Sequence, residues 1–278
     1  MEPGPKSNVG ATAAHWIAAK ELGFTAPTAN SMDATSDRDF VLEYLQALTN
    51  VGLHASRFAE EITLFATAEF GFVQLPEAFS TGSSAMPQKK NPDLLELVRG
   101  KTGRVVAHAT ALTMTLKGLP LAYNKDLQET QEALFDSADT MLSMLPLVAG
   151  FMKAVEFSHP RMEQAAQSGF TNAWAAATYL VKRGVPSRLA HERIGRAVRL
   201  CLEKNCELQD LALDELRAVD PTFESDFYAC LSLASVLAVH DVAGGTAPAR
   251  VQQAIKSAKT KIESLREEIH AHAQSDLA

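Results

Sequence analysis

The sequence has little cysteine, and the three residues present, Cys201, Cys206 and Cys230, are too few for a disulfide framework. Few cysteines are typical of a reducing compartment, and the spacing of Cys201 and Cys206 does not match a zinc site. We therefore expect a cytoplasmic protein in which these thiols serve as small buried apolar groups.

Long hydrophobic runs are also absent. No stretch reaches the roughly 18 apolar residues of a membrane-spanning helix, and residues 1–6 lack the apolar core of a secretory signal. Positive charge is in deficit, with 26 Lys and Arg against 33 Asp and Glu and a net charge of −7. These absences predict a protein with neither a membrane nor a nucleic acid as its partner.

Aromatic residues make up only 7%, and Val and Ile are sparse beside Ala and Leu, which favours helices over strands. A long helix is predicted from Asp37 to about Phe70, with Ser36 and Asp39 at the spacing of a capping box. Its length of roughly 50 Å predicts a bundle of long helices. One apolar stripe follows this helix and comprises Phe40, Tyr44, Leu48, Val51, Ala55, Phe58, Ile62 and Phe65.

The remaining pattern predicts an all-α protein in two parts. Long helices are expected over 93–116 and 127–157 and a short one over 13–22, separated by loops at 71–92 and 117–126. After Pro160 the predicted helices shorten; they cover 160–168, 171–183, 187–205, 213–219 and 222–231, before a terminal helix over 248–274. We expect residues 1–158 to belong to the central bundle, with a signature loop at 79–92, and residues 159–278 to form a smaller helical domain.

The segment from Thr81 to Asn91 stands out chemically. It places two hydroxyls, Ser83 and Ser84, and two ammonium groups, Lys89 and Lys90, just before a helix N-terminus, which attracts anions. Residues 81–131 contain seven Lys and Arg against four Asp and Glu, a local charge of +3 in an acidic chain. Both a site for a small anion and a merely solvated basic loop fit this pattern.

Other kinds of site do not fit the sequence. Gly82 lacks the second glycine and the preceding strand of a nucleotide-binding phosphate loop, and no G-x-S-x-G elbow of a serine hydrolase occurs. The eight histidines include no H-E-x-x-H pair, and His270 and His272 would face different sides of a helix. We expect neither a metal nor an organic cofactor.

Residues 82–92, GSSAMPQKKNP, resemble the long signature of the fumarase/aspartase superfamily. Four further segments resemble the argininosuccinate lyase family: NSMDATSDRDF at 30–40, LVRGKTGR at 97–104, KGLPLAYNKDLQE at 117–129 and GGTAP at 244–248. The resemblance extends from about residue 24 to residue 251 and implies the superfamily's long helical bundle, with no cofactor.

The resemblance implies a cytosolic enzyme of arginine biosynthesis that eliminates fumarate from argininosuccinate and leaves arginine. It implies a homotetramer whose sites combine loops of three subunits. Ser83 is the implied general base, assisted by Lys89. The implied substrate contacts are Ser84, Asn91, Tyr123 and Gln128, and the implied supporting residues are Glu96, Arg38 and Lys125.

Two departures from the family pattern leave a second interpretation open. The S-R-N-D and T-H segments of the family's N-terminal part do not occur, and Gln131 stands where the family has a carboxylate-binding lysine. The alternative is a non-catalytic or complementing helical subunit, which needs a partner chain that carries the missing segments. In that case Tyr123 and Gln128 would only hold their loop, and Glu96 would only be a favourable charge at a helix start.

Overall fold

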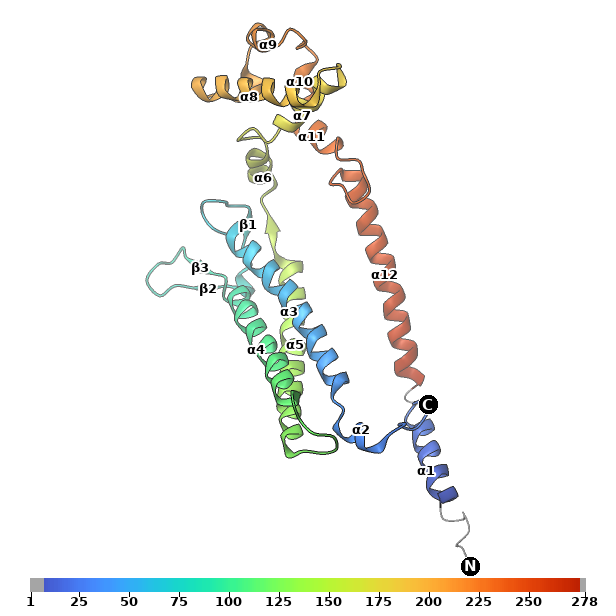
Figure 1. Ribbon diagram of the computed structural model, residues 1–278. Helices are drawn as coiled ribbons and strands as arrows, with labels where there is room; N and C mark the ends of the chain where they lie inside the picture. The colour runs from blue at the N-terminus through green and yellow to red at the C-terminus, as the bar shows by residue number, and fades with distance from the viewer. Residues whose placement is uncertain (1–7, 276–278) are drawn as a thin grey trace, which may run out of the picture. The chain divides into compact units, whose positions relative to one another are not determined.

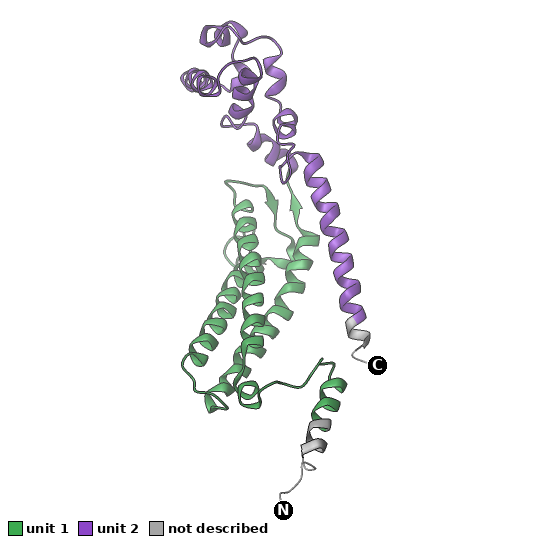
Figure 2. Ribbon diagram, turned by 45° about the vertical axis from the view of Figure 1, so that its right-hand side comes forward, with its two compact units in different colours: residues 1–158 green, residues 159–278 purple. Residues whose placement is uncertain are grey.

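The computed structural model describes residues 8–275, with side chains described for 14–271. The chain divides into two compact units, residues 1–158 and 159–278 (Figure 2). The helices of unit 1 are α1 (Asn8–Glu21), α2 (Ser31–Ser36), α3 (Asp39–Phe65), α4 (Asp93–Leu116) and α5 (Glu129–Ala154), with 3₁₀ turns η1 (Glu77–Phe79) and η2 (Lys125–Gln128). Its short strands are β1 (Val73–Gln74), β2 (Thr81–Gly82), β3 (Lys90–Asn91) and β4 (Glu156–Phe157).

The three long helices α3, α4 and α5 pack side by side as a bundle (Figure 1). Their shared core consists of buried aliphatic side chains, Met141, Met144 and Phe151. α3 and α4 approach closely at Gly52, where an added Cβ would lie 3.3 Å from the Thr102 side chain. The Thr102 hydroxyl donates to the Gly52 carbonyl at 3.0 Å, so this contact is both close and polar.

The predicted stripe on α3 is wrong over the first half of the helix. Phe40 and Tyr44 are 66% and 45% exposed, whereas their neighbours Val41 and Leu45 are buried against α4 and α5. Ile62, in the second half of the stripe, is buried as expected. Because α3 has apolar residues on two faces, the spacing alone did not identify the face that packs in the bundle.

The start of α3 also differs from the prediction. Ser36 ends α2 and donates its hydroxyl to the carbonyls of Met32 and Asp33, so no Ser36 capping box forms. The first amide of α3, that of Asp39, is bound instead by the Asp37 carboxylate at 2.8 Å. The helix ends at Phe65 rather than Phe70.

The segment predicted as a loop at 71–92 contains short strands. Two antiparallel pairs form, β1 with β4 and β2 with β3. The sequence did not predict them, because β4 is distant from β1 in the chain, β2 and β3 are polar, and two-residue strands show no alternation of apolar and polar residues. The helix predicted at 93–116 is found as α4. The one predicted at 127–157 is found as η2 with α5 but ends at Ala154, because residues 156–157 form β4 instead.

Unit 2 comprises α6 (His159–Ala166), α7 (Ala173–Lys182), α8 (Ser187–Lys204), η3 (Leu208–Asp210), α9 (Leu213–Val219), α10 (Phe227–Cys230), α11 (Leu233–Ala238) and α12 (Pro248–Ser275). Its core surrounds Phe223 and Phe227, which meet edge to face with ring centroids 4.8 Å apart. The predicted helix at 222–231 is reduced to α10, and α2 and α11 were not predicted. Both are only six residues long, which is too short for a clear period.

The helix α12 exposes an apolar stripe along its length. Val251, Ile255, Ile262, Leu265 and Ile269 are between 43% and 66% exposed. Before it, Gly245 lies so close to the His240 carbonyl oxygen that an added Cβ would be 2.1 Å away. Within residues 8–275, none of the helices has the length and apolar character that crossing a bilayer requires.

The predicted fold class is confirmed: the protein is mainly helical, with a central bundle of long helices and a smaller helical part after it.

Candidate functional site

The signature segment is a hairpin at one end of the bundle, before α4 (Figure 1). Thr81 pairs with Asn91 and Gly82 with Lys90, which leaves residues 83–89 as the tip. The Lys89 amide donates to the Met86 carbonyl at 3.1 Å and closes a turn within the tip. Ser83, Ser84 and Lys89 therefore all lie in the tip of the hairpin.

Three contacts hold the base of the hairpin. The Phe79 ring meets Phe151 of α5 edge to face at 6.0 Å, and Gly150 leaves room for it, since an added Cβ there would lie 3.1 Å from Phe79 Cζ. The Thr81 hydroxyl donates to the Asp93 carboxylate in the first turn of α4. Lys90 Nζ lies 2.5 Å from Glu77 Oε1. The hairpin is therefore fixed to both α4 and α5.

Ser83 is half-buried, and its oxygen accepts two backbone hydrogen bonds. The Ala85 and Met86 amides donate to Ser83 Oγ at 3.2 and 3.3 Å. Donors directed at an oxygen stabilise negative charge on it, so this geometry favours a Ser83 alkoxide over one in open solvent. The Ser84 side chain, by contrast, is exposed beside it.

The two lysines of the signature have different surroundings. Lys90 forms the ion pair with Glu77, whereas Lys89 is exposed and has no carboxylate partner within the described part of the chain. Of the two signature lysines, Lys89 is therefore the one whose ammonium group remains available to an anion.

Asn91 and Glu96 lie near the base of the hairpin. Asn91 belongs to β3, and Glu96 lies in the first turn of α4. Glu96 Oε1 is 3.9 Å from Arg99, whose guanidinium also pairs with Glu60 of α3. We call Ser83, Ser84, Lys89, Asn91 and Glu96 the serine group.

The other predicted residues lie at the opposite end of α4. Tyr123 is 51% exposed in the loop between α4 and α5, and Lys125, Gln128 and Gln131 follow it as exposed side chains. The Asn124 amide holds this loop by donating to the Pro120 and Ala122 carbonyls, each at 3.1 Å.

Arg38 lies beside this loop, at the start of α3. Its guanidinium donates to the carbonyls of Thr35 and Asp37, at 3.3 and 2.6 Å. A cavity of about 370 Å³ lies between residues 33–39 and the loop residues 116–122 and 127. We call Arg38, Tyr123, Lys125, Gln128 and Gln131 the tyrosine group.

The serine and tyrosine groups cannot meet within one bundle. They flank α4, whose 24 residues extend about 36 Å at 1.5 Å per residue. Figure 1 shows the β2–β3 hairpin and the α4–α5 loop at opposite ends of the three helices. One small ligand therefore cannot contact both groups of the same chain.

A polar cluster that the sequence did not reveal joins α4 to α5 between these ends. His108 Nε2 lies 2.8 Å from Asp136 Oδ2, and Arg104 pairs with the same carboxylate. Partial burial raises the pKa of Asp136, but the hydrogen bonds from His108 and Arg104 outweigh it and hold that pKa below its usual value. The partners are 28 and 32 residues apart, so no local spacing indicated them.

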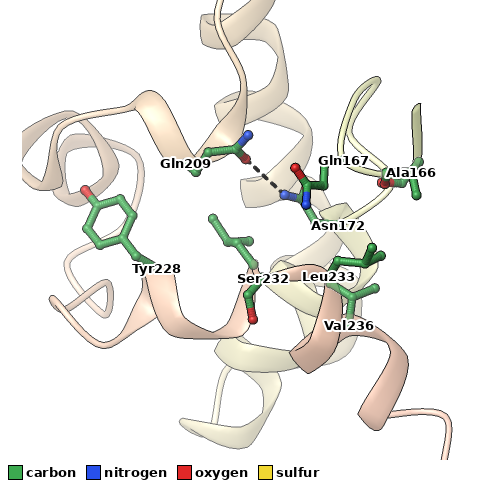
Figure 3. Close-up of a pocket in the computed structure, with 10 residues that line it drawn as sticks. Ala166, Gln167, Asn172, Gln209, Tyr228, Ser232, Leu233 and Val236 are labelled. Carbon is green, nitrogen blue, oxygen red and sulfur yellow. Dashed lines mark hydrogen bonds between the residues drawn. The ribbon is translucent and has the colours of Figure 1, made fainter. Parts of the chain in front are cut away.

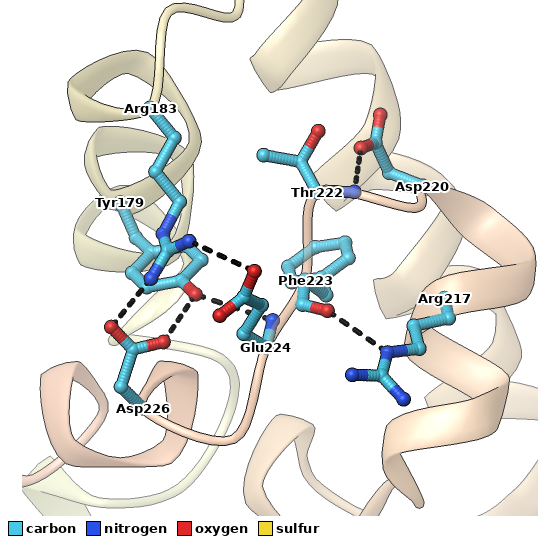
Figure 4. A network of polar contacts seen from close by, with 8 residues as sticks. All are labelled: Tyr179, Arg183, Arg217, Asp220, Thr222, Phe223, Glu224 and Asp226. Carbon is cyan, nitrogen blue, oxygen red and sulfur yellow. Dashed lines mark hydrogen bonds and ion pairs between the residues drawn. The ribbon is translucent and has the colours of Figure 1, made fainter.

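Unit 2 contains a second such network (Figure 4). The Tyr179 hydroxyl and the Arg183 guanidinium both donate to Asp226, each at 2.6 Å, and the guanidinium lies 4.6 Å above the Tyr179 ring. Burial and the hydrogen bond to Asp226 raise the pKa of Tyr179 to about 12. This network links α7 to the segment before α10 and has a structural role.

Metal ligands do not gather in the described residues: no three His, Cys, Asp or Glu side chains within 14–271 are placed to hold an ion.

Comparison with known proteins gives two family matches. A model described as "Lyase" matches residues 7–107, and one described as "Argininosuccinate lyase C-terminal" matches residues 170–238. Argininosuccinate lyase from Acidobacterium capsulatum is 61% identical over 261 residues, which are 94% of this chain and 53% of that protein. The same enzyme from Koribacter versatilis is 59% identical over 91% of this chain and 54% of its own length. The chain thus spans about half the length of the curated relatives it matches.

Solved structures agree on the fold. EDDS lyase in complex with formate superposes with a TM-score of 0.80 at 23% identity, over 92% of this chain and 53% of that one. A fumarate lyase described as delta crystallin from Brucella melitensis has a TM-score of 0.58 at 19% identity, over 75% and 44%.

Proposed function

Because this chain belongs to the fumarase/aspartase superfamily of lyases and matches the C-terminal portion of argininosuccinate lyases, we propose that it contributes the serine and tyrosine groups to an argininosuccinate lyase site. The reaction is elimination of fumarate from argininosuccinate to leave arginine. The observation that carries the proposal is the Ser83 oxygen held by two amide donors on a hairpin fixed to the bundle.

Ser83 acts as the general base in this proposal. Its alkoxide takes a proton from the carbon beside a substrate carboxylate, the bond between the neighbouring carbon and nitrogen breaks, and fumarate forms. The Ala85 and Met86 amides lower the cost of the alkoxide, and the free ammonium of Lys89 attracts the charge that develops on the carboxylate. The nitrogen that leaves receives a proton from an acid outside the serine group.

The site is shared between copies of the chain. Since about 36 Å of helix separates Ser83 from Tyr123, both can contact one substrate only if they come from different chains. We propose a homotetramer in which the serine group of one copy meets the tyrosine group of another. Exposed apolar side chains on α5, such as Phe135 at 60% and Leu142 at 71%, provide surface for such packing.

The second candidate is a complementing subunit that is inactive alone. Gln131 favours it, because a neutral amide cannot replace the Coulomb attraction of an ammonium for a carboxylate. We propose a cytoplasmic location for either form, since Cys201, Cys206 and Cys230 are unpaired thiols.

The test measures fumarate release by ultraviolet absorbance in two samples. One sample is the purified chain alone, and the other is the chain co-assembled with a full-length argininosuccinate lyase whose own loop serine is replaced by alanine. We expect little turnover from the chain alone and restored turnover in the mixture. Turnover by the chain alone would refute the complementing form, and an inactive mixture with verified mixed oligomers would refute a catalytic role of the serine group.

A further inference from the structure

A half-open cavity in unit 2 is lined by residues of α6, the segment between α6 and α7, η3, α10 and α11 (Figure 3). Its volume is about 280 Å³, near the lower end of small-molecule sites. The polar walls are Gln167, Asn172 and Gln209, and apolar walls come from Tyr228, Leu231 and Val236. None of the residues that line it carries a charge.

Asn172 is the unusual residue of this cavity. It is only 6% exposed, and its Oδ1 has no hydrogen-bond donor in the described part of the chain. Its Nδ2 donates to Gln209 Oε1 at 3.1 Å, and Figure 3 shows these two side chains pointing toward one another. A buried acceptor without a donor is rare in native proteins and indicates a group that the protein itself does not supply.

The position of Asn172 at the start of α7 makes its unpartnered oxygen unusual. It is the N-cap of α7, where an asparagine oxygen normally accepts an amide of its own helix, but its side chain makes no capping bond. The neighbouring polar groups already have partners: the Tyr228 hydroxyl donates to the Leu211 carbonyl at 2.7 Å, and the Ser232 hydroxyl lies 2.9 Å from that of Ser235. These neighbouring groups therefore do not donate to Asn172 Oδ1, which stays available to a ligand.

The groups left open define the chemistry of an occupant. Asn172 Oδ1 is buried and needs a donor. The Gln209 side chain beside it is exposed, and its amide nitrogen makes no hydrogen bond to the described residues, so it can donate to solvent or to a ligand. A neutral group that carries an N–H next to a carbonyl satisfies both. An ammonium or a carboxylate does not fit, because burying a charge without a counter-charge is costly.

We propose that this cavity binds a small uncharged molecule through a primary amide or urea group, with its apolar part against Leu231 and Val236. The amide N–H of the ligand donates to Asn172 Oδ1, and its carbonyl accepts from the Gln209 amide. This binding site is independent of the proposed elimination.

Three probes of similar shape and different charge test the proposal on the full chain. They are isovaleramide, isovalerate and isopentylamine, and dissociation constants come from saturation-transfer NMR titrations at pH 7. We expect isovaleramide to bind saturably and at least about tenfold more tightly than either charged probe. The amide alone avoids the cost of burying a charge, and isovalerate also lacks the N–H that Asn172 Oδ1 needs. Equal affinity for the three probes, or no saturable binding of the amide because the cavity holds water only, would overturn the proposal.

Variants locate the binding. Asn172→Leu removes the acceptor, Val236→Phe fills the cavity, and each is expected to weaken isovaleramide binding at least about tenfold. Val181→Phe is the matched control, since Val181 is 41% exposed on α7 and does not line the cavity; it should bind within about twofold of wild type. Circular dichroism checks that each variant folds, and if Asn172→Leu does not, Val236→Phe decides. Unchanged affinity in the folded variants would refute the site.

Discussion

Replacing Ser83 by alanine should abolish elimination and leave the fold intact. Within residues 14–271, the hydrogen bonds lost are those from the Ala85 and Met86 amides, at 3.2 and 3.3 Å. Both residues are exposed, so water can replace the lost acceptor and the free energy of unfolding should fall by less than about 1 kcal/mol. Removal of a general base typically lowers a rate by about 10²–10⁴-fold. The variant therefore separates catalysis from stability.

The assay is fumarate release by the mixed oligomer described above, with helix content and oligomer size measured in parallel. Ser80→Ala is the matched control, because its hydroxyl donates to the Pro76 carbonyl at 2.9 Å at the base of the same hairpin. We expect Ser80→Ala to retain turnover within about threefold, a stability effect of about 1 kcal/mol being too small to unfold the hairpin. Near-native turnover of Ser83→Ala, or equal losses in both variants, would remove Ser83 from the proposed mechanism.

Three further predictions concern stability. Asp136→Asn should lower the urea midpoint of unfolding at pH 7. Since the pKa of Asp136 is depressed, the difference in urea midpoint between wild type and variant should shrink as pH falls below about 4. An unchanged difference in midpoint at pH 3 would contradict a stabilising role of the carboxylate. Tyr179→Phe should remove a tyrosinate absorbance step near pH 12, because the pKa of Tyr179 is raised to about 12. The stability that the Tyr179 hydroxyl contributes is present below pH 10 and is lost as pH rises through 12. The same absorbance step in both proteins would refute the raised pKa. Gly245→Ala should lower the melting temperature of unit 2 by several degrees, since the new Cβ would lie 2.1 Å from the His240 carbonyl, and an unchanged melting curve would contradict this packing.

The spacing of apolar residues and the positions of glycine and proline predicted most of the helices. The range 93–116 is found as α4 with both ends correct, because Pro92 precedes it and Gly118 follows it. The buried face of α3 could not be predicted, because Phe40 and Val41 are equally apolar and only the partner helices choose between them.

The sequence predicted which residue types form the candidate site but not their arrangement. Ser83 and Tyr123 are 40 residues apart in sequence, and the helix predicted over 93–116 already separates them by its length. The contact between Phe79 and Phe151 that fixes the hairpin to α5 could not be predicted. The pairing of Lys90 rather than Lys89 likewise depends on Glu77, which lies in η1 before β2. Long-range contacts of this kind have no signature in spacing.

The placement of the two groups at the ends of α4 restricts how the gene can change. Deleting one residue from α4 would shift one end by about 1.5 Å and rotate it by about 100° relative to the other. That shift would misalign the Gly52–Thr102 contact with α3 and the Asp136 cluster with α5 at the same time. Insertions and deletions should therefore be tolerated in the loops and excluded from the three helices, unless all three change length together by whole heptads.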